Sequence, residues 1–144
     1  MLIGEYKHTL DSKKRLAIPA RLRKEIGERA ILTRGLNNSL FLYPLEQWQK
    51  LTEKLGQLSV GQADTRSFLR LMFASAAEAA LDRLGRILIP DYLKKYAGLG
   101  PRVVIVGVYD RLEIWDEARW ESYKVEVEKN TDMIAEKLGE LGLY

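Results

Sequence analysis

Two short motifs of the form D-x-x-x-R carry the side chains best suited to chemistry. Asp11 and Arg15 form the first motif, and Asp82 and Arg86 form the second. A planar guanidinium donates paired hydrogen bonds to a guanine edge or to a phosphate. A carboxylate four residues earlier can hold a tight turn through backbone N–H groups, or it can pair with the arginine. We therefore assign the arginines as groups that read nucleic acid and the aspartates as groups that orient them.

Further basic residues surround both motifs. Phosphate contacts from such residues supply affinity and register but little sequence information. The phosphate-contact candidates are Lys13, Lys14 and Arg83, and the basic surface is extended by Arg21, Arg23 and Lys24, with Lys94 and Lys95. Two alternatives stay open at this point. Each Asp–Arg pair can be a salt bridge that only holds a turn, and the other basic residues can form a solvated helix face.

The charge is unevenly distributed along the chain, although the formal net charge is only +3. Residues 7–24 contain seven basic residues and one acidic residue, whereas residues 110–144 contain ten acidic and five basic residues, a net of −5. One face of the molecule should therefore attract polyanions such as nucleic acid, and another should not. Accidental clustering on a solvated surface is the alternative.

The composition excludes several kinds of site. The 144 residues are 47% hydrophobic and 30% charged, which is typical of a folded globular chain. Because cysteine is absent and His8 is the only histidine, we expect no disulfide, metal site, cofactor or Ser/His/Asp arrangement. No apolar run approaches the ~20 residues of a membrane span, and the strand-like first residues show no signal segment. We expect a cytoplasmic protein with no membrane partner and no small-molecule substrate.

A carboxylate pair is the one catalytic device left to consider, because a pseudo-symmetric fold can bring Asp11 and Asp82 together. Each aspartate has an arginine four residues later and other basic residues nearby. Cationic neighbours keep both carboxylates ionised and prevent them from sharing a proton. We therefore expect the chain not to be an enzyme.

An internal repeat organises the chain. Residues 10–19 align with residues 81–90 at a constant offset of 71, and leucine, aspartate, arginine, isoleucine and proline match. The alignment continues, after one inserted residue, to Trp48 and Trp120. We expect a first repeat at residues 1–50, a helical connector at 51–75, a second repeat at 76–122 and a C-terminal helical tail at 123–144.

Each copy is expected to contain the same elements in the same order. The predicted strands are residues 3–10, 16–18, 30–33 and 40–43 in the first copy, and 76–81, 87–89, 103–106 and 112–115 in the second. A proline and a glycine bound a short helix of about two turns, from Pro19 to Gly27 and from Pro90 to Gly98. Turns are expected at 35–38 and 107–110. Aromatic residues at helical spacing predict a longer helix that packs on the core, and 63–74 and 131–141 are also predicted to be helical.

These motifs make the chain resemble the MraZ family of bacterial regulators, which is related to the AbrB and SpoVT type of swapped-hairpin DNA-binding domain. The resemblance rests on D-x-x-x-R, a short apolar strand and a proline, present twice and followed each time by a tryptophan-bearing helix. It covers essentially the whole chain. It implies an α+β fold, mainly β, in which two tandem AbrB-like repeats form a pseudo-two-fold double-psi-type β-barrel with helices packed outside.

The same resemblance implies a sequence-specific DNA-binding transcriptional regulator whose partner is double-stranded DNA. By that resemblance, several chains form a ring that binds direct repeats upstream of the division and cell-wall gene cluster. The resemblance also implies that the regulator is encoded in that cluster, which would make it an autoregulator associated with the nucleoid. A ring presents its sites head to tail, which suits direct repeats, and linking weak sites raises their effective concentration.

One residue departs from the family pattern. Glycine usually precedes the motif arginine, as Gly85 does, but Lys14 precedes Arg15. Because glycine suits a turn with positive φ, Lys14 is expected to strain the first turn slightly or to change its shape, and to add a charge near a phosphate.

Two other functions stay open. The first is an oligomeric protein-interaction scaffold without specific DNA binding, which predicts no steep salt dependence. The second is an antitoxin or a general transition-state regulator, although those proteins more often carry one copy of the motif per chain.

Overall fold

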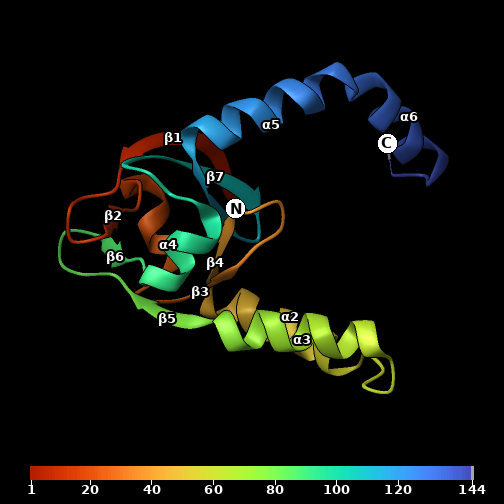
Figure 1. Ribbon diagram of the computed structural model, residues 1–144, viewed down its shortest axis with the longest axis horizontal. Coiled ribbons are helices and arrows are strands. Elements are labelled where there is room, and N and C mark those ends of the chain that lie inside the picture. The colour runs from red at the N-terminus through yellow and green to blue at the C-terminus, as the bar shows by residue number, and fades with distance from the viewer. Residues whose placement is uncertain (144) are drawn as a thin grey trace.

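The computed structural model describes residues 1–143 and repeats one succession of elements in the two halves of the chain (Figure 1). The first half contains β1 (Leu2–Thr9), β2 (Arg15–Ala17), η1 (Ala20–Leu22), α1 (Arg23–Ile26), β3 (Arg29–Arg34), β4 (Leu40–Pro44), α2 (Leu45–Gly56) and α3 (Ala63–Ser75). The second half contains β5 (Ala77–Ala80), β6 (Arg86–Leu88), α4 (Asp91–Ala97), β7 (Arg102–Tyr109), β8 (Leu112–Asp116), α5 (Glu117–Lys129) and α6 (Thr131–Glu140).

The large sheet combines strands from both halves. Its six strands lie in the order β1-β7-β8-β4-β3-β5, and all neighbours are antiparallel. If each strand is exchanged for its counterpart in the other half, this order reads the same from the opposite end. The expected α+β class and the pseudo-two-fold repeat are therefore confirmed.

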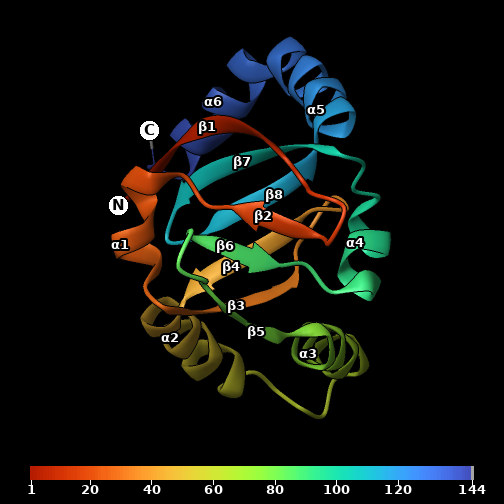
Figure 2. The same cartoon turned by 90° about the vertical axis from the view of Figure 1, so that its left-hand side faces the viewer.

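A second, two-stranded sheet carries the motif arginines. Strands β2 and β6 pair antiparallel, with Arg15 opposite Leu88 and Ala17 opposite Arg86. Figure 2 shows this small sheet in front of the large one, between its end strands β1 and β5. The expected barrel needs strands in that position, and closure of the barrel stays a prediction.

The core lies between the two sheets, because buried and exposed side chains alternate along the two short strands and the buried ones face the large sheet. Leu16 and Ile87, in the middle of β2 and β6, are buried, as are Ile18 and Ile89 just after these strands. Successive strand residues point to opposite faces, so burial of Leu16 turns Arg15 toward the surface. Full burial of such a side chain stabilises the fold by about 1.5–3 kcal/mol. The core therefore fixes the direction of the arginines.

The longer helices lie on two sides of the sheets (Figure 1). Trp48 of α2 contacts Tyr43 and Phe73, with ring centroids 5.8 Å away in each case. Trp120 of α5 contacts Trp115, with the ring centroids 5.2 Å apart and the ring planes tilted by 58°. Both tryptophans are half-buried and join a helix to the sheet, as the core-packing interpretation predicts. Tyr123 of α5 joins the same packing, since its ring centroid lies 4.9 Å from that of Trp115 and 6.0 Å from that of Trp120, although its side chain is still 38% exposed.

Two predicted elements differ from the structure. The connector predicted at residues 107–110 is mostly strand, because β7 runs to Tyr109 and pairs there with Leu2. In addition, the helix predicted after Pro19 is split into η1 and the single-turn α1, whereas its counterpart α4 is continuous. Among residues 1–143, no helix is long and apolar enough to cross a membrane.

Candidate nucleic-acid interface

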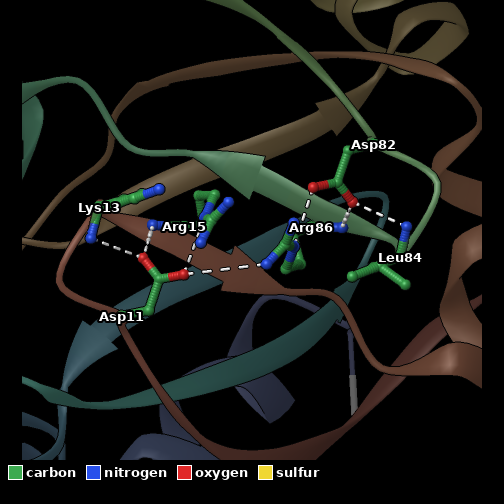
Figure 3. A network of polar contacts seen from close by, with 6 residues as sticks. All are labelled: Asp11, Lys13, Arg15, Asp82, Leu84 and Arg86. Atoms are coloured by element: carbon green, nitrogen blue, oxygen red, sulfur yellow. Dashed lines mark hydrogen bonds and ion pairs between the residues drawn. The ribbon is translucent and has the colours of Figure 1, made fainter.

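The first D-x-x-x-R turn is organised around the carboxylate of Asp11 (Figure 3). Its Oδ1 accepts hydrogen bonds from the backbone N–H groups of Lys13 and Arg15, both at 2.9 Å. Its Oδ2 accepts a 2.8 Å bond from Nε of Arg15. The backbone closes the turn, since the Lys14 N–H donates to the carbonyl of Asp11 at 3.0 Å. One carboxylate thus holds both the turn and the arginine side chain.

The second turn repeats this geometry. Asp82 Oδ1 accepts from the N–H groups of Leu84 and Arg86 at 2.9 Å, and Oδ2 accepts from Nε of Arg86 at 2.8 Å. The Gly85 N–H donates to the carbonyl of Asp82 at 2.9 Å. The repeat seen in the sequence is therefore also a repeat of side-chain contacts.

Both aspartates are held in the ionised form. The backbone hydrogen bond from Arg15 is the largest influence and lowers the pKa of Asp11 below its usual value, with the Arg15 side chain acting in the same direction. Arg86 lowers the pKa of Asp82 in the same way. A catalytic dyad needs one carboxyl with a raised pKa, and this arrangement gives the opposite.

Pairing of β2 with β6 brings the two motifs into one cluster. Arg86 NH1 lies 4.0 Å from Asp11 Oδ2, across the small sheet, and Figure 3 shows the two turns facing each other there. The Arg15 side chain is 33% exposed and that of Arg86 is 26% exposed. Within residues 1–143 the terminal nitrogens of Arg15 form no hydrogen bond. Two oriented guanidinium groups therefore share one surface.

The residue before each arginine has a left-handed backbone. Lys14 has φ 62° and Gly85 has φ 73°. The two turns thus have the same shape, and Lys14 adopts a conformation that glycine accepts more readily. The Lys14 ammonium forms an ion pair with Asp91 at the start of α4. Its charge is therefore partly neutralised within the chain.

The other predicted basic residues lie around the second turn more than the first. Lys13 in the first turn and Arg83 in the second turn are both exposed, although they are not equivalent positions. Arg23 is half-buried and donates from Nε to the carbonyl of Ile18 at 2.8 Å. A groove of about 680 Å³ runs beside the second turn, and its basic lining residues are Arg23, Lys24, Arg29 and Arg83. Lys94 lines a smaller groove of about 400 Å³ beside the first turn.

His8 adds no charge to this surface. It is half-buried on β1, and burial, followed by the nearby charge of Arg23, lowers its pKa below the usual value. The imidazole is therefore neutral near neutral pH. No group of three or more metal-ligating side chains occurs in the part of the chain that the structure describes.

Two leucines beside the motifs were not among the predicted site residues. Leu88 is 59% exposed, on the same small sheet as the arginines, and Leu84 is 63% exposed at the tip of the second turn. Apolar side chains in such positions suit contact with a thymine methyl group. The signal in the sequence is the alternation in β6, where Leu88 stands between the buried Ile87 and Ile89.

Comparison with known proteins matches this arrangement. A family model described as "MraZ protein, putative antitoxin-like" matches residues 1–71 and again residues 72–139, one match for each half. Proteins named "Transcriptional regulator MraZ" from Acetivibrio thermocellus and Caldicellulosiruptor bescii are each 48% identical over 143 residues, 99% of this chain and 100% of each relative. The protein of that name from Moorella thermoacetica is 48% identical over 138 residues, 96% of either chain. The resemblance seen in the motifs is thereby confirmed, and the chain belongs to the MraZ family.

Proposed function

We propose that this chain is a transcriptional regulator that binds double-stranded DNA sequence-specifically through the small sheet formed by β2 and β6. The observation that carries the proposal is the pair of aspartate-held arginines, Arg15 and Arg86, on one exposed surface. An arginine reads a base only when its direction is fixed, and here the carboxylates of Asp11 and Asp82 supply that constraint. The relatives' name, "Transcriptional regulator", supports the same function.

Each predicted residue has a distinct role in this proposal. Arg15 and Arg86 contact base edges in the major groove, and Asp11 and Asp82 orient them. The phosphate contacts, which fix register and add affinity, come from Lys13, Lys14 and Arg83. Of these three, Lys14 contributes least because Asp91 already pairs with its ammonium.

The wider role is proposed from the family resemblance. The regulator acts in the cytoplasm at the nucleoid, on direct repeats upstream of the division and cell-wall gene cluster that includes its own gene. It requires no cofactor, metal or small-molecule substrate, and it is not an enzyme. The relatives carry the name of a regulator, which agrees with that expectation.

Assembly into a homo-oligomeric ring belongs to the same proposal. Exposed apolar residues on the outer helices support association, because large apolar patches on soluble proteins usually mark interfaces. They include Phe68, Leu71 and Phe73 on α3 and Met133, Ile134 and Leu138 on α6. Sedimentation velocity measures the assembly, and a symmetric dimer that prefers inverted-repeat DNA would contradict the ring.

Fluorescence anisotropy tests the function directly. The native chain, Arg15→Ala, Arg86→Ala and the control Arg70→Ala, an exposed arginine on α3, are titrated with duplex DNA from upstream of the gene and with scrambled DNA. We expect the native chain and the control to prefer the upstream DNA, with log affinity falling linearly with log salt. Both motif variants should lose the preference.

The remaining outcomes separate the alternatives. A preference that survives both motif substitutions would place the DNA surface elsewhere on the molecule. Binding that is absent, or weak and indifferent to sequence, would favour an oligomeric protein-interaction scaffold.

A further inference from the structure

The two turns share one backbone shape, yet their surroundings differ in a way that bears on DNA. Arg23 lies across Gly85, so closely that a Cβ at position 85 would overlap its guanidinium. Its Nε donates to the carbonyl of Ile18, and the N–H of Ile18 donates to the carbonyl of Gly85 at 2.9 Å. These contacts fix the plane of the Arg23 guanidinium beside the second turn.

The fixed guanidinium keeps one edge for a ligand. Within residues 1–143, the two terminal nitrogens of Arg23 form no hydrogen bond or ion pair, and Arg23 lines the groove of about 680 Å³. Lys24 and Arg83, which line the same groove, are exposed and also have no ion-pair partner among those residues. The terminal edge of a guanidinium binds phosphate with paired hydrogen bonds.

The remaining charges of the groove leave it cationic. Arg29 is engaged with Glu78 through bonds of 2.7 and 3.1 Å, and Asp82 is engaged with Arg86. Glu28 is the only other acidic residue in the described lining. Three unpaired cations thus face one unpaired carboxylate, which suits a single phosphate.

The first turn has no equivalent site. At the offset of 71, Lys14 replaces Gly85, Lys94 replaces Arg23 and Ser12 replaces Arg83. Lys14 pairs with Asp91, and the corresponding groove is smaller, at about 400 Å³. A Cβ at position 85 would overlap Arg23, and position 14, its counterpart, carries a lysine side chain.

We propose that Arg23, with Lys24 and Arg83, binds one backbone phosphate of the DNA beside the second turn, and that the first turn lacks such a site. This inference rests on the proposed function, and it makes the two halves unequal. Because Asp82 both lines the groove and holds Arg86, the phosphate belongs next to the base that Arg86 reads. Phosphate contacts position a protein on the duplex, so the second half contributes a register contact, through an oriented guanidinium, that Lys13 and Lys14 do not supply in the first half.

The test compares Arg23→Gln with Lys94→Gln, which makes the same change of charge at the equivalent place in the other half. Anisotropy is measured on upstream and scrambled duplexes across a salt series. For Arg23→Gln we expect about tenfold weaker binding to both duplexes alike, and a slope of log affinity against log salt reduced by about 0.9, the value for one phosphate contact. Lys94→Gln should leave the slope unchanged.

Arg83→Gln is a second test of the site in case Arg23→Gln fails to fold, because Arg83 forms no hydrogen bond within the described residues. It should lower the affinity for both duplexes to the same extent. Thermal unfolding is recorded for every variant. If the native chain shows no preference for upstream DNA, the proposed function fails. If the preference is present but neither Arg23→Gln nor Arg83→Gln alters the salt slope, only the phosphate site is wrong.

Two other results would also overturn the site. If Arg23→Gln removes the preference but keeps the slope, Arg23 acts on base reading instead of on phosphate. If inorganic phosphate shows ³¹P line broadening that depends on Arg23 while DNA affinity does not, the groove takes a free anion and not the DNA backbone.

Discussion

At the scale of single residues, Lys14 and Gly85 show what the same backbone demands of two different side chains. Both have positive φ, a conformation that costs a residue other than glycine about 1–2 kcal/mol. Lys14→Gly removes that cost and loses an exposed ion pair with Asp91, worth about 0–1 kcal/mol. We expect the free energy of unfolding to rise by about 0.5–1 kcal/mol, measured by urea denaturation.

Gly85→Ala is the matched control for that substitution. The new Cβ takes on the cost of positive φ and overlaps Arg23, so the free energy of unfolding should fall by more than about 1 kcal/mol. A lower stability of Lys14→Gly would show that the ion pair with Asp91 outweighs the backbone cost.

The carboxylates of the two turns make stability depend on pH. The pKa of Asp82 is lowered in the folded state from an ordinary value of 3.8. Its contribution is therefore present above that value and is lost as the pH falls through the lower folded-state pKa. Asp82→Asn keeps an acceptor for the backbone N–H groups but loses the bond to Nε of Arg86. We expect the variant to be less stable at neutral pH, with the difference shrinking below about pH 4 in urea titrations.

The control for this pH effect is Asp132→Asn, an exposed residue in α6. Its substitution should leave the pH dependence of unfolding as in the native chain. A difference between native chain and Asp82→Asn that stays constant down to about pH 3 would contradict the linkage.

At the scale of elements, the three-residue strand β6 has one face buried in the core and the other exposed at the surface. Ile87 is 1% exposed, whereas Leu88 is 59% exposed. Ile87→Ala leaves a cavity between the two sheets and should cost about 2–5 kcal/mol. Leu88→Ala should change stability by no more than about 0.5 kcal/mol. Urea denaturation of both variants checks this, and equal losses would contradict the direction of the strand.

Local patterns were enough to predict most elements and both turns. The offset of 71 and the D-x-x-x-R spacing located the motif pairs, because turn chemistry depends on residues close in sequence. Residues distant in sequence account for what was missed. The end of β7 is strand because it pairs with Leu2. Likewise, Lys14 forms an ion pair with Asp91, and the Arg23 side chain lies across Gly85. No local periodicity encodes those contacts.

At the scale of the whole molecule, the halves exchange strands. Strand β1 pairs along its whole length with β7 of the second half, and β5 of the second half pairs with β3 of the first. Within residues 1–143, the motif strands β2 and β6 also pair only with each other. Each half therefore leaves its own first strand without a partner inside that half, and the arginine cluster exists only when both halves are present.

This exchange predicts how separated halves behave. Fragments 1–75 and 76–144, produced separately, should each be unfolded or should fold only by self-association, because each lacks the strands that cover its apolar face. An equimolar mixture should recover the circular dichroism spectrum and the DNA preference of the intact chain. The reference is the melting temperature of the intact chain, measured over the same range of protein concentrations. A single fragment that folds as a monomer, with a melting temperature independent of concentration, would contradict a core shared between the halves.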